Sequence, residues 1–383
     1  MARLEEICSL ITDGSHFSPE DEGAGYPMFS VKDMTPNGFN ISGCKKIGEE
    51  AYKKLVANGC KPLNDDVVVA KDGSYLKTAF VIKGNPEITL LSSIAILRPK
   101  IDLVVPEYLS YFLKSDAVYR TVSLNYITGT ALKRIILKGI RKIEVDLPDI
   151  GEQEQRAQRL SKVDYLCQLR KQQLAKLDEL VKARFVEMFE NSSWPNTSLN
   201  DICSEIVDCP HSTPKYEGNL EHPAIRTTEI KKGYIDWDSM KYVSEEEYQK
   251  RIKSLKPVPG DIVYGREGTY GNAAIIPDGY EFCLGQRVML FRPNKTKCIS
   301  AYVLYAILSD HVKRQADEKN VGATVPHVNV ADAKQFDVVL PPLSIQNQFA
   351  AFVEHVDKQK QTVQQSLEKL ELMKKALMQE YFG

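Results

Sequence analysis

The sequence predicts a mixed α/β protein in which two similar globular domains are separated by two long antiparallel helices that form a coiled coil. Three observations support this fold class. The chain repeats itself after roughly 195 residues, each copy ends in a long heptad-patterned stretch, and each copy mixes short strand-like runs with turns. A repeat of this length is not a solenoid, whose units span about 20–50 residues. The pattern therefore indicates an internal pseudo-two-fold repeat, with one domain and one helix in each half.

Three pairs of segments carry the repeat. RLEEICSLITDGSHFSP returns as SLNDICSEIVDCPHSTP, KPLNDDVVVAKDGSY as KPVPGDIVYGREGTY, and GTALKRIILKGIRKIEVDLP as GATVPHVNVADAKQFDVVLP. The repeat divides the chain into domains at residues 1–150 and 191–342, a central helix at 151–190 and a C-terminal helix at 343–383. Two similar but non-identical surfaces suit a ligand with two different halves, and a stretch of duplex DNA is the obvious one.

Within each domain, short apolar runs between Gly, Pro, Asn and Asp turns predict strands. These runs lie at residues 67–70, 79–82, 93–97 and 142–147, and again at 261–264, 273–276, 287–291 and 335–340. A helix is expected at 106–120, which opens with Pro and Glu as many first turns do, and another at 300–314. We expect both helices to serve core packing.

The two long segments have the pattern of helices that pack on other helices. Gly and Pro are absent from residues 152–190, and apolar residues recur there and in 343–383 at three- and four-residue spacing. An antiparallel pair is the simplest arrangement; the alternative is that each helix docks on its own domain. The stripe residues expected to carry helix and partner contacts are Leu160, Val163, Leu174, Leu177, Val181, Phe352, Val356, Val363, Leu370 and Leu377.

Composition limits the class of protein. With 43% hydrophobic and 26% charged residues, the chain is an ordinary globular protein. No apolar run approaches the roughly 18 residues of a membrane span, and no leader opens the chain, so a cytoplasmic location is expected. The cysteines lack zinc spacing; Cys8 and Cys203 share a repeat position and are expected in the core. Because the net charge is −1, DNA binding would need local basic patches or a more basic partner.

Catalytic signatures are absent from the sequence. It contains no GxxxxGK[ST] loop, no GxGxxG after a strand, no GxSxG elbow and no HExxH helix. Residues 340–343, LPPL, lack the polar residue and the aromatic of an amino-methyltransferase motif. Asp13 with His16, repeated as Asp208 with His211, offers too few ligands for a metal and is more typical of an Asp-led turn. We therefore assign no catalytic and no metal-binding residue.

The first of two repeated loops follows a strand in each copy and holds polar side chains suited to DNA. Arg or Lys can recognise guanine in the major groove, hydroxyl groups reach phosphates, and tyrosine stacks or contacts sugar. The alternative is a hairpin turn whose tyrosine packs inward. The candidates are Lys71, Ser74 and Tyr75 in the first copy and Arg266, Thr269 and Tyr270 in the second.

The second repeated loop is the polar start of an apolar strand, with two serines in one copy and Gln-Arg in the other. Gln and Arg can each make bidentate contacts with a base edge. A basic run at 133–142 contains no acid until Glu144; its alternative is a solvated strand edge. Two further basic residues are weaker candidates. The DNA-binding candidates of these segments are Ser92, Gln286, Arg287, Lys133, Arg134, Lys32 and Arg226.

The order of motifs resembles the specificity (S) subunit of Type I restriction–modification systems over essentially the whole chain. Each domain closes with a Gly-Thr/Ala segment, a Leu-Pro pair and glutamines, and each helix ends in a motif like LDELVKARFVEMF at 177–189, of which LELMKKALMQEYF at 370–382 is a looser copy. The closing segments are Gly129-Thr130, Leu147-Pro148 and Gln153 to Gln155, then Gly322 to Thr324, Leu340 to Leu343 and Gln346 to Gln348. The first Pro-Pro-Leu is altered to Pro148-Asp149-Ile150.

The resemblance implies a subunit that is not itself an enzyme. Its two target-recognition domains would each recognise one half of a split, asymmetric DNA sequence, and its helices would measure the spacer and dock two methyltransferase (M) subunits. Restriction (R) subunits would complete an ATP-dependent nuclease. No cofactor is expected on this chain; S-adenosylmethionine, ATP and Mg are expected on the partner subunits.

Two alternatives stay open at this point. One is a non-DNA coiled-coil adaptor whose two α/β heads bind proteins, which the near-neutral charge favours. The other is a nuclease with an unfamiliar motif, since Glu229-Ile230-Lys231 has the acid-x-Lys spacing. It lacks a preceding positioned Asp.

Overall fold

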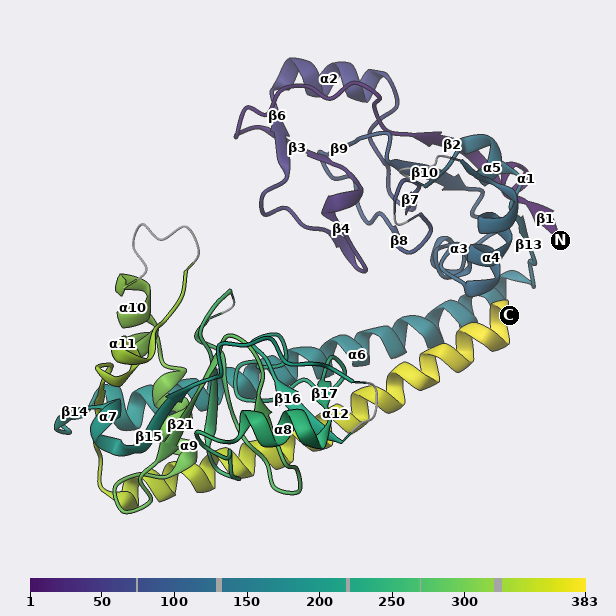
Figure 1. Ribbon diagram of the computed structural model, residues 1–383. Coiled ribbons are helices and arrows are strands. Elements are labelled where there is room, and N and C mark those ends of the chain that lie inside the picture. Colours follow the sequence, from purple (N-terminus) through teal and green to yellow (C-terminus); the bar gives the residue numbers. More distant parts are fainter. Residues whose placement is uncertain (74, 129–132, 218–220, 269, 320–325) are drawn as a thin grey trace. The chain divides into compact units, whose positions relative to one another are not determined.

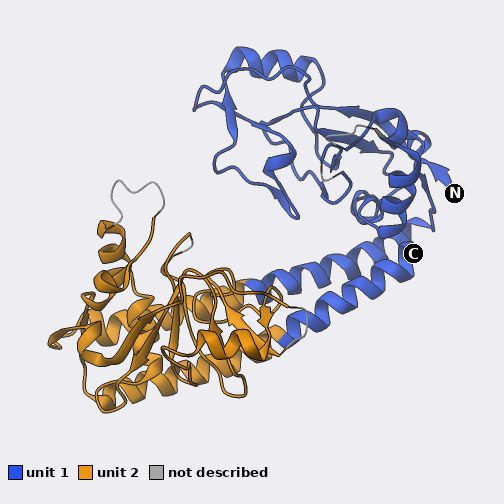
Figure 2. Ribbon diagram, viewed as in Figure 1, with its two compact units in different colours: residues 1–171, 365–383 blue, residues 172–364 orange. Residues whose placement is uncertain are grey.

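The computed structural model describes residues 1–73, 75–128, 133–217, 221–268, 270–319 and 326–383 (Figure 1). They form two compact units, residues 1–171 with 365–383 and residues 172–364 (Figure 2). Each unit combines one mixed α/β domain with a stretch of both long helices. The predicted fold class is confirmed.

Unit 1 is built on a four-stranded antiparallel sheet in the order β2-β10-β7-β8. All four residues of β7 are buried, which explains its continuous apolar run. A three-stranded sheet, β6-β3-β9, has one parallel pair between β3 and β9. The strands are β1 Ala2–Arg3, β2 Cys8–Asp13, β3 Tyr26–Phe29, β4 Met34–Thr35, β5 Gly38–Phe39, β6 Lys45–Ile47, β7 Val67–Ala70, β8 Ala79–Val81, β9 Thr89–Leu90, β10 Ile94–Pro99, β11 Ile127–Thr128, β12 Arg134–Ile135 and β13 Glu144–Val145.

Unit 2 repeats both sheets in the same order, as β15-β21-β18-β19 and β17-β16-β20, with the parallel pair again between corresponding strands. In each unit the first strand also pairs with the last, β1 with β13 and β14 with β22. The strands are β14 Asn196–Ser198, β15 Cys203–Asp208, β16 His222–Ile225, β17 Lys241–Val243, β18 Ile262–Gly265, β19 Ala273–Ile275, β20 Cys283–Leu284, β21 Val288–Pro293 and β22 Asp337–Val339. The predicted duplication is thus present in both main sheets and in the pairing of the first strand with the last; the two-stranded pairs β4-β5 and β11-β12 have no counterpart strands in the described part of unit 2.

The predicted domain helices each divide in two. The first becomes α3 and α4, because the Ser115 hydroxyl accepts a hydrogen bond from the Val118 N–H (3.3 Å) and caps a new helix. Ser309 does the same for Val312 (3.2 Å) between α9 and α10. The short helices are α1 Leu4–Ile7, α2 Glu49–Ala57, α3 Pro106–Leu113, α4 Asp116–Asn125, α5 Leu137–Arg141, α7 Leu199–Ile202, α8 Glu245–Arg251, α9 Ser300–Ile307, α10 Asp310–Lys319 and α11 Val330–Lys334.

The long helices are α6 (Ile150–Phe185), which continues as one π-helical turn (Val186–Glu190), and α12 (Leu343–Phe382). In unit 1 the first part of α6 lies beside the last part of α12, with Lys374 Nζ 2.6 Å from Asp164 Oδ1. In unit 2 the last part of α6 lies beside the first part of α12, with Lys360 Nζ 2.7 Å from Asp178 Oδ1. The antiparallel pairing is therefore confirmed within each unit (Figure 1).

The predicted helix stripe faces the inside of the protein. Leu160 belongs to the core of unit 1, and Val181, Val356 and Val363 belong to the core of unit 2. The helices thus pack on each other and on a domain at the same time, so both arrangements considered from the sequence are present. Buried in this stripe are Leu160, Val163, Leu177, Val181, Val356 and Val363, and partly buried are Leu174, Phe352, Leu370 and Leu377.

A buried glutamine in the first turn of each long helix joins that helix to its domain. The Gln153 side chain is 1% exposed; its oxygen accepts from the Val105 N–H (3.0 Å), and its amide donates to the carbonyls of Leu103 (3.2 Å) and Pro148 (2.9 Å). Gln346 repeats this with the Ile299 N–H (3.0 Å) and the carbonyls of Lys297 (3.0 Å) and Pro341 (2.9 Å). We call these two residues the glutamine clamps.

The far end of each long helix is held by an aromatic side chain. Phe382 packs against Tyr108 in unit 1, with ring centroids 5.1 Å apart. Phe189 packs against Tyr302 in unit 2 at 5.0 Å. Each domain therefore holds the start of one long helix and the end of the other.

All eight cysteines are buried and free, so the predicted core positions of Cys8 and Cys203 are confirmed. Burial raises the pKa of the Cys8 thiol to about 12. Within the described ranges, none of the helices has the length and apolar character needed to cross a membrane.

Replacing Gln153 by Ala should lower the free energy of unfolding by about 1–3 kcal/mol, because the Val105 N–H and two carbonyls would lose their partner in a buried place. Thermal and denaturant unfolding of the purified protein measure this change. Gln155→Ala, at an exposed position of the same helix, is the matched control. Equal stability of the two variants would contradict the role given to the clamp.

Candidate nucleic-acid interface

The loop after β7 carries a basic side chain that is paired inside unit 1. Lys71 is 7% exposed, and its Nζ lies 3.2 Å from Asp13 Oδ2 and 3.7 Å from Asp72 Oδ1. Asp13 is the last residue of β2, which reaches this loop because β10 pairs with both β2 and β7. The charge of Lys71 is thus balanced before any ligand arrives.

Unit 2 places the same types of side chain at the same positions. Arg266 forms an ion pair with Asp208, the last residue of β15. A histidine stands beside the acid in both units: His16 Nε2 is 3.5 Å from Asp13 Oδ1, and His211 Nε2 is 3.8 Å from Asp208 Oδ2. In the described part of the chain, no group of three or more His, Cys, Asp or Glu side chains could hold a metal. The acid beside each histidine also pairs with the base of the loop, Lys71 or Arg266.

The two loop tyrosines are held inside their domains. Tyr75 is 4% exposed, its hydroxyl lies 3.1 Å from the Ser123 hydroxyl, and its ring stacks on Tyr119 at 5.3 Å. Tyr270 donates a hydrogen bond to Asp317, which raises the pKa of the tyrosine. This is the inward packing of the hairpin alternative, so stacking of Tyr75 on DNA would require the loop to rearrange. Ser74 and Thr269, the hydroxyl candidates of this loop, lie outside the described residues.

The second predicted loop lies directly beside the first. The Lys71 N–H donates to the Ser93 carbonyl (3.0 Å), and the Arg266 N–H donates to the Arg287 carbonyl (2.9 Å). Ser92, the candidate in the first copy, is partly buried, and its N–H donates to the Ser15 carbonyl (2.9 Å). The structure thus brings together the two segments that the sequence singled out separately.

In unit 2 this junction surrounds a polar cavity of about 140 Å³, which we call the Arg266–Arg287 cavity. Gln286 donates to the Thr213 hydroxyl (2.8 Å), and Arg287 Nε lies 3.0 Å from Glu267 Oε2. The Arg287 side chain is 67% exposed, and its backbone has a positive φ of 60°. The cavity is lined by Cys209, Pro210, His211, Ser212, Arg266, Glu267, Gln286 and Arg287.

The basic run of unit 1 joins the Lys71 loop through its backbone. The Gly73 N–H donates to the Lys133 carbonyl (2.8 Å), and the Ile135 N–H donates to the Lys71 carbonyl (2.9 Å). The side chains of Lys133 and Arg134 are exposed beside that loop. The resembling segments Gly129-Thr130 and Gly322 to Thr324 lie outside the described residues.

The two weaker candidates differ in their surroundings. Lys32 is exposed in a short 3₁₀ helix (Val31–Asp33). Arg226 pairs with Glu229, which is fully buried, and its guanidinium lies 5.5 Å from the Tyr216 ring centre. Because Glu229 accepts from both the side chain and the N–H of Arg226, the acid-x-Lys motif holds a turn in place.

Two partners of these side chains were not predicted from the sequence. Glu267 holds Arg287, and Thr213 holds Gln286. The available signal for Glu267 was the acid that follows the base in both copies, Asp72 and Glu267. The available signal for Thr213 was the hydroxyl residue before the last proline of the first repeated segment in both copies, Ser18 and Thr213.

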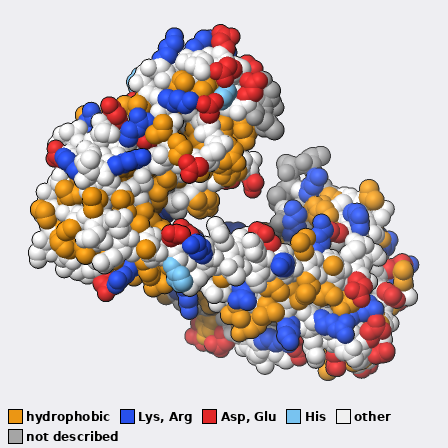
Figure 3. All heavy atoms as spheres, turned by 90° about the horizontal axis from the view of Figure 1, so that it is seen from below, with side chains coloured by type: hydrophobic (Ala, Val, Ile, Leu, Met, Phe, Trp, Pro, Cys, Tyr) orange, Lys and Arg blue, Asp and Glu red, His pale blue; other side chains and the backbone are white. Residues whose placement is uncertain are grey.

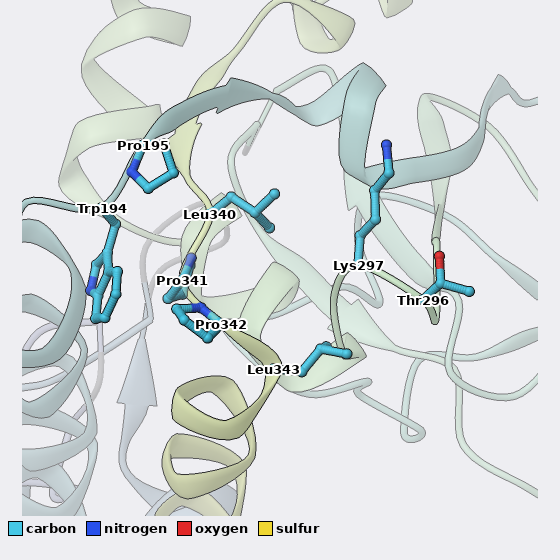
Figure 4. Close-up of a pocket in the computed structure, with 8 residues that line it drawn as sticks. All are labelled: Trp194, Pro195, Thr296, Lys297, Leu340, Pro341, Pro342 and Leu343. Carbon is cyan, nitrogen blue, oxygen red and sulfur yellow. The ribbon is translucent and has the colours of Figure 1, made fainter.

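An apolar cavity of about 500 Å³ lies at the head of α12, away from these loops in sequence (Figure 4). Trp194, Pro195 and the segment 340–343 line it, with Thr296 and Lys297. It contains no acid and no histidine among its lining residues. On the face drawn in Figure 3, basic and acidic side chains are interspersed and apolar ones lie among them.

The two domains share one fold but present different polar side chains from corresponding loops. Such an arrangement suits a protein that recognises two different parts of one ligand. The sequence model of the family described as "Type I restriction modification DNA specificity domain" matches residues 1–179 and 191–372. The chain belongs to this family.

Curated relatives agree with the family, and solved structures share the fold. The specificity subunit of the type I restriction enzyme MjaVIII of Methanocaldococcus jannaschii is 23% identical over 380 residues, covering 94% of this chain and 86% of that protein. The putative MjaX specificity subunit of the same organism is 29% identical over 196 residues, covering 49% and 45%. The structure of a type I S subunit from M. genitalium has a TM-score of 0.58 at 13% identity, covering 100% of this chain and 95% of that chain. A structure reported for assembly of the type I R-M system has a TM-score of 0.57 at 17% identity, covering 100% and 96%.

Replacing Arg266 by Met should destabilise the protein by about 1–3 kcal/mol, because Asp208, whose side chain is 25% exposed, would lose its partner. Adding Asp208→Asn should recover part of the loss, so the double variant is more stable than the sum of the single changes predicts. Denaturant unfolding of the four proteins measures this coupling. Strict additivity would mean that the two side chains do not stabilise each other.

Proposed function

We propose that this chain is the non-catalytic specificity subunit of a Type I restriction–modification complex and that each domain recognises one half of a split, asymmetric DNA site. One observation carries the proposal beyond the family match. The same backbone frame presents Lys71 and Ser93 in one domain but Arg266 and Arg287 in the other. Since different donors select different base edges, the two domains would recognise unlike half-sites. The DNA-binding residues named from the sequence remain proposed contacts.

The charge distribution supports a division between affinity and specificity. The net charge is −1, and the bases Lys71, Arg226 and Arg266 are paired with acids of their own domains. Phosphate contacts supply most of the affinity of DNA-binding proteins. That affinity would therefore come largely from partner subunits that enclose the DNA.

The partners follow from the family, in which DNA, M subunits and R subunits assemble with the specificity subunit. We further infer that two M subunits bind, one for each half of the duplicated chain. S-adenosylmethionine, ATP and Mg would reside on those partners, with no cofactor on this chain. A cytoplasmic location, where DNA is accessible, fits this role. The adaptor alternative is not favoured.

The first test is a map of N6-methyladenine across the source genome, with and without this gene. We expect deletion to abolish methylation at one split, asymmetric motif, and a plasmid copy of the gene to restore it. Such a result gives both half-sites at once. If every split, asymmetric motif that is methylated in cells with the complete system stays methylated after the deletion, the proposal is wrong.

The helices also predict where a partner can bind. The stripe residues named from the sequence are largely turned inward, and their direct contact with a partner stays a prediction. Large apolar side chains that are exposed on the same helices in unit 1 are better placed. They are Tyr165 (60% exposed) and Leu169 (39%) on α6, and Leu372 (67%) and Met373 (52%) on α12.

Changing Tyr165 and Leu169 together to Ser should weaken binding of an M subunit at least tenfold and leave thermal stability nearly unchanged, because these side chains contact solvent in the free protein. Leu160→Ala, about one and a half turns from Tyr165 and two and a half from Leu169 in the buried stripe, should instead cost about 2–5 kcal/mol of stability. Titration calorimetry and unfolding separate the two effects. Unchanged M-subunit affinity of the double Ser variant would place the docking surface elsewhere.

A further inference from the structure

One buried arginine in unit 2 is used by none of the predicted sites. Arg251, the last residue of α8, is 4% exposed, and its side chain is 1% exposed. Glu247, one turn earlier, lies 3.4 Å from its guanidinium and balances the charge. The other nitrogen contacts are to backbone and hydroxyl oxygens. They are Leu284 O (2.8 Å), Gly285 O (2.7 Å), Pro210 O (3.4 Å), Ser212 O (3.3 Å) and Ser212 Oγ (3.3 Å).

These oxygens belong to the two segments that form the walls of the Arg266–Arg287 cavity. Pro210 and Ser212 line one wall, and Leu284 and Gly285 lead directly into Gln286 and Arg287 of the other. A guanidinium carries five N–H donors in a rigid planar fork. By donating to both segments at once, Arg251 fixes the separation and the register of the two walls.

The fold itself does not require this arginine. In unit 1 the fourth residue of α2, Tyr52, stacks on Tyr26 at 3.9 Å; in unit 2 the fourth residue of α8, Tyr248, stacks on His222 at 4.0 Å. The residue three places later is Leu55 in unit 1 and Arg251 in unit 2. Leu55 simply belongs to an apolar core cluster. A buried charge is costly where a leucine suffices, so the arginine points to a task particular to the second domain.

The segment that Arg251 holds contains an unusual backbone. Arg287 has a φ of 60°, in the left-handed region that residues with a side chain rarely adopt. Such a conformation persists only where the surroundings determine it, and it often occurs at binding sites. The preceding Gly285 lies so close to the Ile225 carbonyl that an added Cβ would stand 2.7 Å from that oxygen. The polar side chains at the mouth of the cavity thus depend on a tightly held strand start.

We propose that Arg251 is a positioning residue that orients Gln286 and Arg287 toward the edges of purine bases, and that the half-site preference of the second domain depends on it. The inference rests on the proposed function. Arg matches the two acceptors of guanine and Gln the donor–acceptor pair of adenine, provided that each side chain is held in a fixed orientation. The first domain, with Ser92 and Ser93 at these positions, has neither the two side chains nor the arginine.

The test uses the full chain assembled with its M subunits and duplex libraries in which one half-site is fixed and the other is randomised. Sequencing of methylated products gives the preference at each position. Arg251→Met should reduce discrimination at one or more positions of a single half-site by roughly tenfold and leave the other half-site unchanged. Arg251→Lys keeps the charge but not the fork and should give an intermediate result.

A matched control separates positioning from general stability. Arg292→Met removes a different arginine of the same domain, which pairs with the buried Asp261 (2.7 Å) and is absent from the cavity lining. It should lower the unfolding temperature and leave both half-site preferences as in the wild type. Gln286→Ala and Arg287→Ala should relax the same half-site as Arg251→Met.

The outcomes distinguish failure of the proposed function from failure of the positioning role of Arg251. If the wild-type complex selects no split motif, the proposed function fails. If it selects one, and a folded Arg251→Met or Arg251→Lys complex keeps both preferences, the positioning role is overturned. Equal relaxation of both half-sites would also overturn it, because the effect would then not be confined to the second domain. Should Arg251→Met yield no folded complex, Arg251→Lys decides between these outcomes.

Discussion

The organisation of this protein depends on the way each long helix is joined to a domain at its first turn. A glutamine amide satisfies one N–H and two carbonyls of a loop and a strand end that would otherwise be buried without partners. Because Gln153 and Gln346 make the same three contacts, both helices leave their domains in the same way. The aromatic ends, Phe189 and Phe382, then insert into the opposite domain's core. Antiparallel packing follows from these four anchor points together with the duplicated sequence.

A duplicated frame allows each copy to change its surface without endangering the fold. Both copies keep the central sheet and a base-acid pair in the loop after β7 or β18. Both also keep a second ion pair, Asp66 with Arg98 in unit 1 and Asp261 with Arg292 in unit 2. The two copies differ in their side chains at the start of β10 and β21 and in the helix that covers the smaller sheet. Arg251 of unit 2, at the position of Leu55 in unit 1, is an example. It holds a loop in one copy only, while the stacked aromatic pair beside it is kept in both.

The sequence predicted the fold class, the repeat and the two long helices because each is expressed in a long pattern, and several central strands because their apolar runs are uninterrupted. Val67–Ala70 was predicted at its observed bounds. Short features were not predicted where a single side chain determines where a helix ends. Ser115 and Ser309 divide helices through single capping bonds. The strands predicted at 142–147 and 335–340 are shorter in the structure, as β13 (Glu144–Val145) and β22 (Asp337–Val339), and the helices α5 and α11 that directly precede them were not predicted. In the site, the loops were found, but the pairing of Lys71 with Asp13 and of Arg266 with Asp208 depends on tertiary contacts. No local pattern expresses such contacts.

This pairing has a consequence for how a nearly neutral protein could achieve sequence specificity. Arg287 and Arg266 form ion pairs with Glu267 and Asp208. In the proposed function, a base edge would have to replace or share those carboxylates. A matching base would restore the lost hydrogen bonds, whereas a mismatched base would leave Arg266, whose side chain is 14% exposed, and its acid without partners, which is costly. In the proposed function, the acids would thus weaken binding to wrong sequences more than binding to the right one. Such a domain gains little from phosphates alone, and that fits a subunit whose partners provide the sequence-independent affinity.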